Sequence, residues 1–321
     1  MMTSLKMWSL LSLSVLFLLS IVPTETKVVQ SMSQCDGFLF KKPPQVPEIL
    51  EQGRIRKTKQ YKIICQTYNN KRRFVTLYDT KNKIPVFSAY KYRGDSKSTK
   101  VQKDSRIWMM EPQLEDLKND ENMEECDRSE YNHQASDDDY KTDPHYDRGH
   151  LLPKSYAYDE SDKISTCTLT NIVPQVKSFN NGSWKKMEEC VKGIFESHCL
   201  NKEAYVLIGA KPSENNMLNN KVNIPSMLWS AFCCNTGRGW VAGAFWGDNV
   251  EANSKYLGMK TLTQLHHKLS KGHSSFEAFP GTKCPLNQMV SNHFPEINQR
   301  CQKGQRSPSA STTLTKEGNT S

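Results

Sequence analysis

The side chains that could do chemistry lie in one stretch of the chain, between Tyr146 and Glu188. His150 ends a run Asp-Arg-Gly-His, and Asn180 and Glu188 follow it with Trp184 midway between them. Hydrolysis of a phosphodiester requires a base that activates water and a cation that stabilises the charge of the transition state. An imidazole can be that base, and amide and carboxylate oxygens suit a hard cation such as Mg²⁺. These residue types therefore predict metal-assisted phosphodiester hydrolysis.

Each of these side chains has an ordinary structural alternative. A single histidine is most often a structural hydrogen-bonding residue, and Asn180-Asn181-Gly182 is typical of a turn. Glu188 lies next to Glu189 and could be an exposed acid on a helix, so Glu189 is its rival for any role in the site. The combined spacing, rather than any single residue, favours a functional site.

The whole segment resembles the DNA/RNA non-specific endonucleases, a branch of the His-Me finger (ββα-metal) nucleases. The family is marked by Asp-Arg-Gly-His, by an Asn-Pro-Gln-like stretch, and by Asn-x-x-x-Trp-x-x-x-Glu. This chain has the first at 147–150, a similar stretch at 171–175, and the third at 180–188. The cysteine-rich setting and the stretches at 232–234 and 245–247 are similar to an animal branch of that family.

The resemblance implies a role for each matching position. His150 matches the general base, and Asn180 matches the direct protein ligand of a single Mg²⁺, with Mn²⁺ or another divalent cation as a possible substitute. Glu188 matches the acid that steadies the water molecules around that ion, and so counts as both a catalytic residue and a metal-site residue.

Three further residues are assigned to the substrate. Arg106 resembles an upstream catalytic arginine that supports the phosphate, which an arginine can contact through two parallel hydrogen bonds. Asp147 and Arg148 complete the motif, and we expect them to bind substrate by shaping the His150 turn and the approach of the phosphate. Arg106 precedes a long acidic segment, which makes it the weakest of these assignments.

The implied function is that of a secreted, metal-dependent endonuclease with DNA and RNA as substrates and little sequence specificity. The alternative is a catalytically silent protein of the same fold that acts as an extracellular nucleic-acid or receptor-binding module. The intact His150, Asn180 and Glu188 argue against that alternative. A disulfide-rich structural protein with an incidental motif is a third, weaker interpretation.

Asn181-Gly182-Ser183 is an N-glycosylation sequon beside the expected metal ligand. A glycan on Asn181 would crowd Asn180. We therefore expect this sequon to be unused, or the chain to be inactive.

The elements that must position these residues are strands and helices in mixed order. Apolar runs predict strands over 74–78, 84–90, 204–209, 227–233 and 240–246. Helical spacing predicts a helix from Ser183 to His198, capped near Gly182-Ser183, and another through Leu262, Leu265 and Leu269. Without βαβ regularity, the fold class is α+β, with a central antiparallel sheet, a ββα-metal motif and stabilising disulfides.

Charge is distributed unevenly along the 321 residues, whose formal net charge is +9. Residues 111–147 hold fourteen acidic side chains against three basic ones, and we expect a long surface loop there around at most a short helix. Residues 27–106 hold nineteen Lys and Arg against six acids. A basic body suits a polyanion, because each phosphate that it neutralises releases counterions, although basic surfaces are also common in secreted proteins.

The two ends of the chain differ from its body. Lys6 precedes an apolar, serine-interrupted run, which predicts a signal peptide over 1–24 rather than a membrane anchor. We expect an N-terminal extension over 25–60, the nuclease domain over 61–302, and a disordered tail over 303–321. No stable membrane anchor is expected, and the oligomeric state stays open.

Ten cysteines behind a signal peptide indicate disulfides, and their spacing lacks the pairs typical of structural zinc. The connectivity does not follow from the sequence. Cys233 and Cys234 are neighbours that face opposite sides of a strand, so they should take different partners. Cys190 and Cys199 lie on nearly opposite faces of the predicted helix and should not pair with each other.

Overall fold

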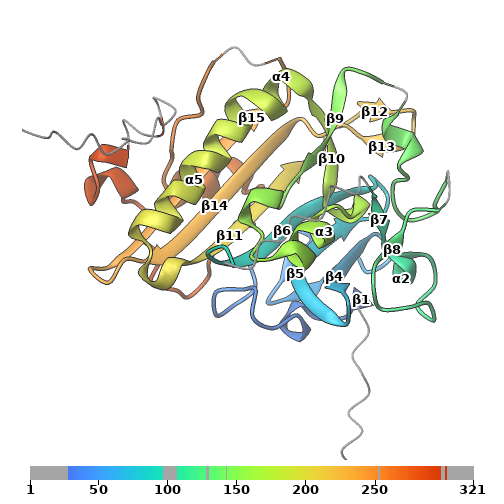
Figure 1. Cartoon of the computed structure of the whole chain (residues 1–321), viewed down its shortest axis with the longest axis horizontal. Coiled ribbons are helices and arrows are strands. Elements are labelled where there is room, and N and C mark those ends of the chain that lie inside the picture. Colours follow the sequence, from blue (N-terminus) through green and yellow to red (C-terminus); the bar gives the residue numbers. More distant parts are fainter. Residues whose placement is uncertain are drawn as a thin grey trace, which may run out of the picture.

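A seven-stranded sheet organises the molecule, and all neighbouring strands in it are antiparallel (Figure 1). The strand order is β1-β4-β5-β6-β11-β14-β15. These strands are β1 (Val28–Val29), β4 (Tyr61–Tyr68), β5 (Lys71–Asp79), β6 (Ile84–Arg93), β11 (Glu203–Lys211), β14 (Met227–Asn235) and β15 (Trp240–Asp248). The sheet confirms the α+β class with a central antiparallel sheet.

The structure is a computed structural model that describes residues 28–96, 107–127, 130–141, 143–251, 254–297 and 301. The predicted signal peptide over 1–24, the catalytic candidate Arg106 and the predicted tail over 303–321 lie outside the described residues. None of the helices in the described part of the chain is long and apolar enough to cross a membrane.

The strands predicted from apolar runs are β5, β6, β11, β14 and β15, so that part of the prediction is confirmed. The sequence analysis missed β4. Its residues are buried almost throughout, since both faces of the sheet are covered. A strand buried on both faces lacks the alternation of polar and apolar residues that marks a strand in a sequence.

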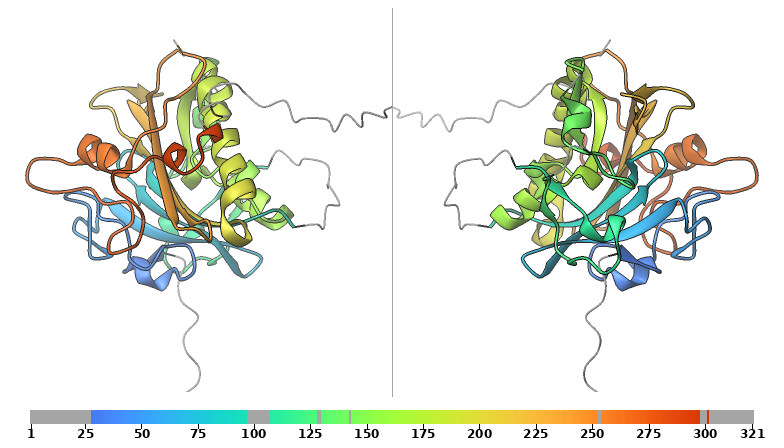
Figure 2. Two further views of the ribbon diagram at one scale, coloured as in Figure 1. Left: turned by 90° about the vertical axis from the view of Figure 1, so that its left-hand side faces the viewer. Right: turned by 90° about the vertical axis from the view of Figure 1, so that its right-hand side faces the viewer.

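Two layers cover the sheet, and Figure 2 shows it edge-on between them. The helix α5 (Lys185–His198) packs against one face through Met187, Val191 and Phe195. The helix α6 (Leu262–Leu269) covers the other face through Leu262 and Leu265. The active-site candidates belong to the layer that contains α5.

The ββα motif lies within that layer. Its strands β9 (Tyr146–His150) and β10 (Ile172–Val176) pair antiparallel, with His150 opposite Ile172. The chain then enters α4 (Lys177–Phe179), a π-helical turn η5 (Asn180–Trp184) and α5. The helical segment thus begins at Lys177, before the predicted Ser183, and Gly182 is a kink rather than part of a cap, with φ −100° and ψ −110°.

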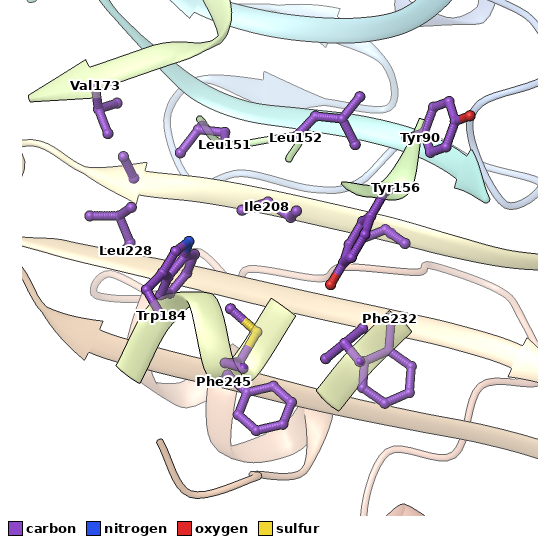
Figure 3. Close-up of a cluster of buried hydrophobic side chains, with 14 of the residues drawn as sticks. Tyr90, Leu151, Leu152, Tyr156, Val173, Trp184, Ile208, Leu228, Phe232 and Phe245 are labelled. Carbon is purple, nitrogen blue, oxygen red and sulfur yellow. The ribbon is translucent and has the colours of Figure 1, made fainter. Parts of the chain in front are cut away.

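The π-helical turn is anchored by Trp184, one of the largest fully buried side chains. Figure 3 shows its ring pointing from the helix toward the strands, near Leu228. A single-turn π-bulge places one extra residue in the turn and is frequent at functional sites. Burial of Trp184 on one side of this turn leaves Asn180 and Asn181 on the other, facing the candidate site.

Disulfides in the described part of the chain include Cys35–Cys65, Cys190–Cys301, Cys199–Cys234 and Cys233–Cys284. Cys234 joins the core on the α5 side, whereas its neighbour Cys233 joins the core on the α6 side. This confirms that the two adjacent cysteines take different partners, and that Cys190 and Cys199 do not pair with each other.

The acidic segment over 111–147 is more structured than the predicted surface loop. It contains α2 (Pro112–Glu115), β8 (Glu124–Glu125), which pairs with β7 (Met109–Met110), and the 3-10 turn η2 (Asp138–Tyr140). Ala135 and Tyr140 are buried in the core on the α5 side. At most one short helix was expected here. The buried contacts were not expected, because fourteen acidic residues outnumber the few apolar residues that anchor the segment.

The remaining elements are short connections around this frame. They are η1 (Met32–Gln34), β2 (Leu50–Glu51), β3 (Arg54–Ile55), η3 (Lys154–Tyr156), α3 (Glu160–Thr166), η4 (Leu169–Asn171), η6 (Leu200–Lys202), β12 (Met217–Leu218), β13 (Val222–Asn223) and η7 (Val290–Asn292). Of these, η3 matters most for the site, because Lys154 and Ser155 form part of its wall.

Candidate active site

The structure brings His150, Asn180 and Glu188 to the wall of a single cavity of about 300 Å³. His150 comes from the end of β9, Asn180 from the π-helical turn, and Glu188 from the first turn of α5. The rest of the wall is formed by Pro153, Lys154, Ser155, Asn181, Lys185 and Glu189. The residues predicted from spacing therefore meet in space, although their chemical roles stay predictions.

The imidazole of His150 is held in a neutral state with one nitrogen unused. The pKa of His150 is lowered to about 3, mainly by burial and also by the nearby charge of Lys154, against an opposing hydrogen bond with the backbone of Arg148. Among the described residues, the buried Nε2 atom has no hydrogen-bond partner. The indole of Trp108 covers the ring, with 5.6 Å between the ring centroids. A neutral ring with an unpartnered nitrogen has the properties of a general base.

Gly149 lets β9 approach β10 closely enough to present His150. A Cβ atom on Gly149 would lie 2.2 Å from Oε1 and 2.5 Å from Cβ of Gln175. Neither distance is compatible with van der Waals contact, so the glycine of the Asp-Arg-Gly-His run is required by the side chain of Gln175 on the facing strand. Gly149 in the Asp-Arg-Gly-His run and Gln175 in the 171–175 stretch therefore fit each other across the paired strands β9 and β10.

Asn171 fixes the turn that follows His150. Its side chain accepts hydrogen bonds from the backbone N–H of Leu152 at 3.0 Å and from the hydroxyl of Ser88 at 2.8 Å. It also donates to the carbonyl oxygens of Leu152 and Thr166, at 3.0 and 2.9 Å. A buried amide that satisfies all of these groups ties the end of β9 to the central sheet.

Asn180 is oriented by Asp147. Its Nδ2 donates to Oδ2 of Asp147 at 3.0 Å, and Asn181 donates to the same oxygen at 2.7 Å. An amide whose nitrogen is engaged presents its carbonyl oxygen elsewhere, and here Asn180 lines the cavity. Asp147 was predicted to bind substrate; in the structure it contacts the expected metal ligand, and its substrate role stays a prediction.

Glu188 is a carboxyl group with an altered proton affinity. The pKa of Glu188 is raised to about 8, mainly by burial and also by the nearby Glu189, against the opposing effects of Trp184 and Lys185. Its turn of α5 is fixed by the hydroxyl of Tyr156, which donates to the backbone carbonyl of Glu188 at 3.1 Å. Glu189 also lines the cavity but is exposed, so Glu188 is the more enclosed of the two acids.

Arg148 makes contacts within the protein. Its guanidinium forms an ion pair with Asp137 at 2.7 Å and lies over the rings of Trp108 and Tyr140, at 5.4 and 5.8 Å from their centroids. It is not among the residues that line the cavity. Substrate binding by Arg148 stays a prediction, and its observed contacts connect β9 to the acidic segment.

Sequence reasoning missed three residues of the site. Lys154 and Lys185 bring positive charge to the cavity wall, and Trp108 covers His150. Lys185 directly follows Trp184, and Lys154 lies four residues after His150, so closeness in sequence could have suggested both. Trp108 lies far upstream, and only the fold brings it to the site.

The donors around the cavity fit a hard divalent cation better than zinc. The available atoms are the amide oxygen of Asn180 and the carboxylate of Glu188, and oxygen ligands are those that Mg²⁺ and Mn²⁺ prefer. Over the described ranges, no group of three or more His, Cys, Asp and Glu side chains lies close enough to hold a metal ion. A cation at Asn180 would therefore keep most of its water shell.

Comparisons with known proteins identify the family of the chain. Residues 53–275 match the profile of the DNA/RNA non-specific endonuclease family. The chain is 32% identical over 222 residues to endonuclease domain-containing 1 protein of Mus musculus, covering 65% of this chain and 40% of that protein. For the Homo sapiens protein of that name the identity is 32% over 191 residues, covering 56% and 36%. These relatives confirm the resemblance to an animal branch.

More distant likenesses also exist. A nuclease of Nostoc sp. is 29% identical over 85 residues, covering 26% of this chain and 30% of that protein. A chain in the crystal structure of the EndoG/EndoGI complex, which concerns EndoG inhibition, superposes with a TM-score of 0.45 at 18% identity, covering 63% of this chain and 83% of that one. The chain spans less than half the length of each curated relative named here. Because the family profile covers well over half of its residues, this chain belongs to the DNA/RNA non-specific endonuclease family.

Proposed function

We propose that this chain is a secreted, metal-dependent endonuclease that hydrolyses phosphodiester bonds of DNA and RNA with little sequence preference. The observation that carries the proposal is the shared cavity of His150, Asn180 and Glu188, into which the unpartnered Nε2 atom of His150 can act. Family membership supports the substrate class.

His150 is the general base in this proposal. Its lowered pKa keeps the imidazole neutral at physiological pH, so Nε2 can accept a proton from the attacking water as that water approaches phosphorus. Arg148 supplies a backbone contact that opposes the lowering of the pKa, as expected when a ring N–H faces a carbonyl oxygen. With the other ring nitrogen engaged in that contact, Nε2 is the nitrogen that can accept a proton.

Asn180 and Glu188 would hold Mg²⁺, or Mn²⁺ in its place. The bound cation supplies positive charge next to the phosphate and its leaving oxygen. Asp147 keeps the amide nitrogen of Asn180 engaged, so that the oxygen is the end available to the cation. Glu188 accepts hydrogen bonds from the water molecules around the site when its carboxyl group is ionised.

Low sequence specificity follows from what the cavity offers. The two lysines of its wall, Lys154 and Lys185, suit phosphate oxygens, which carry no sequence information. Binding by such contacts weakens as the salt concentration rises. We therefore expect both DNA and RNA to be cut, with a rate that decreases at high salt.

Secretion is part of the proposal. Four disulfides, together with the apolar N-terminal run, favour an oxidising compartment. Expression in cultured animal cells should place the protein in the medium, with an N-terminus near residue 25. Retention of all of the protein inside the cells would contradict this part.

The test of catalysis is cleavage of supercoiled plasmid and of a structured RNA by the purified mature protein. Mg²⁺ should support nicking, EDTA should abolish it, and His150→Ala should reduce the rate by about 10²–10⁴-fold with an unchanged fold. His145→Ala, which alters an exposed histidine on the same segment, is the matched control and should cut normally. Unchanged cleavage by His150→Ala would overturn the assignment. Nucleic-acid binding without any cleavage would favour the silent binding module.

A further inference from the structure

Two more hollows continue from the candidate cavity along the surface. The first, of about 190 Å³, shares Lys154 and Ser155 with the cavity. The second, of about 840 Å³, shares Tyr158 and Asp159 with the first. Shared wall residues make the three hollows neighbours, in a row from His150 to the start of β5 that is called here the groove.

The far end of this groove is basic. Its wall contains Lys71, Arg72 and Arg73 from the start of β5, and Arg93 from the end of β6. Asp159 is the one acid among the residues that line this hollow. Arg73 is buried and pairs with Asp162 at 3.0 Å and with Asp159 at 3.7 Å, so the exposed positive charge comes from Lys71 and Arg93. An excess of cations in a concave surface concentrates a polyanion there.

Arg93 is held in place while its charge stays accessible. Its guanidinium lies 4.6 Å from the centroid of the Tyr158 ring and 3.2 Å from Oδ2 of Asp162. Asp162 is 2% exposed, whereas the Arg93 side chain is 48% exposed. An arginine fixed on one side by a carboxylate and an aromatic ring keeps further N–H donors for a phosphate on the other.

The middle of the groove is close to neutral. Lys192 pairs with Asp95 at 3.1 Å, and Lys163 pairs with Glu160 at 3.4 Å. These pairs leave little net charge between the two ends. At the candidate cavity, Lys154 and Lys185 are offset by Glu188 and Glu189. The excess of positive charge along the three hollows therefore lies at the start of β5.

We propose that the far end of the groove, formed by Lys71, Arg72, Arg93 and Tyr158 and called here the distal basic hollow, binds the backbone of a single nucleic-acid strand several nucleotides away from the bond that is cut. This inference rests on the proposed function for the identity of its ligand. Tyr158 gives the hollow an aromatic ring beside an arginine, a combination that serves strand binding without sequence preference.

The experiment measures binding separately from cleavage. Fluorescence anisotropy in EDTA follows a labelled single-stranded DNA of about 12 nucleotides, a length within the range of known strand-binding sites. The test variant is Lys71→Gln with Arg93→Gln. The matched control is Arg238→Gln with Lys268→Gln, which removes the same charge from exposed residues that line none of the three hollows.

The distal variant should lose about 10- to 30-fold in affinity at 0.1 M salt, and its slope of log affinity against log salt should fall in magnitude by about 1.4, for two lost phosphate contacts. The control variant should keep the slope of the wild-type protein. Equal slopes for the distal variant and the wild-type protein would overturn the proposal, and so would an equal decrease in both variants, because that result would reflect net charge alone.

Two further measurements keep the result interpretable. Since Arg93 contacts Asp162, thermal unfolding checks each variant, and Lys71→Gln alone, at an exposed position, should still lower the slope by about 0.7. Plasmid cleavage by the wild-type protein is scored separately. Cleavage with an unaltered slope in the distal variant contradicts only the distal hollow, whereas an altered slope without cleavage supports the hollow and contradicts the proposed catalysis.

Discussion

Asn180 donates its side-chain amide to Asp147, with 3.0 Å between Nδ2 of Asn180 and Oδ2 of Asp147. The same carboxylate oxygen accepts a second hydrogen bond from Asn181, at 2.7 Å. A carboxylate can only accept hydrogen bonds, so it selects the nitrogen end of each amide. In the proposed site Asp147 is therefore a positioning residue, which acts through Asn180.

Replacing Asp147 tests this relationship. Asp147→Asn keeps the size of the side chain but removes the charge and allows the amide of Asn180 to turn. Loss of a group that orients a metal ligand costs about 10- to 100-fold in metal affinity. We expect the Mg²⁺ concentration that gives half-maximal cleavage to rise by that factor, and Mn²⁺ binding measured by calorimetry to weaken in parallel.

The control for Asp147→Asn is Asp138→Asn, since Asp138 is about half exposed and pairs with Lys141. Its dependence on Mg²⁺ should match that of the wild-type protein. If Asp147→Asn gave the same metal dependence as well, the orienting role of Asp147 would be wrong, even if the overall rate had changed.

Gly149→Ala tests the fit between the two strands that present His150. The added Cβ would lie 2.2 Å from Oε1 of Gln175, so the strands must separate or Gln175 must move. Overpacking of this kind costs about 1–3 kcal/mol of unfolding free energy. Chemical denaturation should reveal that loss, and cleavage should fall with it because His150 is the next residue.

Gly258→Ala is the matched control for that substitution. A Cβ on Gly258 would meet only the end of the Lys260 side chain, at 3.5 Å, which is ordinary contact. Its effect should stay within about 0.5 kcal/mol, as for most surface substitutions. Equal stability of the two variants would show that the β9–β10 hairpin tolerates a side chain at Gly149.

The sequence predicted the site better than it predicted the surroundings of the site. His150, Asn180 and Glu188 were recognisable because their spacing places them at the end of a strand and on one helical segment. The role proposed for Asp147 was not recognisable, because it depends on how close β9 lies to the π-helical turn. Residue propensities do not predict such a turn. Trp108 was missed for the same reason, being brought to His150 by the fold alone.

Similar limits apply to the fold. Hairpins with clear turn signals, such as that between β5 and β6, were predicted, whereas β4 was missed because burial on both faces removes its alternation. The acidic segment was taken as a loop, since fourteen acids in residues 111–147 mask anchors such as Tyr140. Patterning shows where apolar residues dominate, but not where a few of them anchor a polar segment.

The Cys199–Cys234 disulfide should contribute a large part of the stability. It joins the end of α5 to β14 across 35 residues of sequence. In the chain-entropy view, closing a loop of that length stabilises the fold by about 4 kcal/mol. The double substitution Cys199→Ser, Cys234→Ser should shift the denaturation midpoint accordingly. A midpoint within error of that of the wild-type protein would show that packing of α5 makes this crosslink redundant.

Acid should destabilise the fold through His266, on the side of the sheet away from the candidate site. The sequence analysis placed no role on this histidine, but its Nε2 accepts a hydrogen bond from the backbone N–H of Ala278 at 3.2 Å. Burial lowers the pKa of His266 to about 4. Protonation would remove the acceptor and place a charge against Phe276, whose ring centroid lies 5.8 Å away.

The direction of this effect follows from the two states. In the unfolded chain a histidine has a pKa of about 6.5, so below that value the unfolded state binds a proton more readily than the folded state. The contribution of His266 to stability is therefore complete above about pH 6.5 and decreases as the pH falls toward 4. For a partly exposed ring, we expect a loss of about 1–2 kcal/mol by pH 5.

Comparing the wild-type protein with the variants His266→Gln and His267→Gln separates this effect from the titration of all other groups. His266→Gln keeps a side chain that can accept the hydrogen bond of Ala278 without titrating, and His267→Gln changes the exposed neighbour as a control. The unfolding free energy of each protein is measured at pH 7.5 and at pH 5. Its decrease between the two pH values should be about 1–2 kcal/mol smaller for His266→Gln than for the other two proteins. Equal decreases in all three would mean that His266 takes up its proton in the folded state without cost, and that the Ala278 contact does not depend on its neutral form.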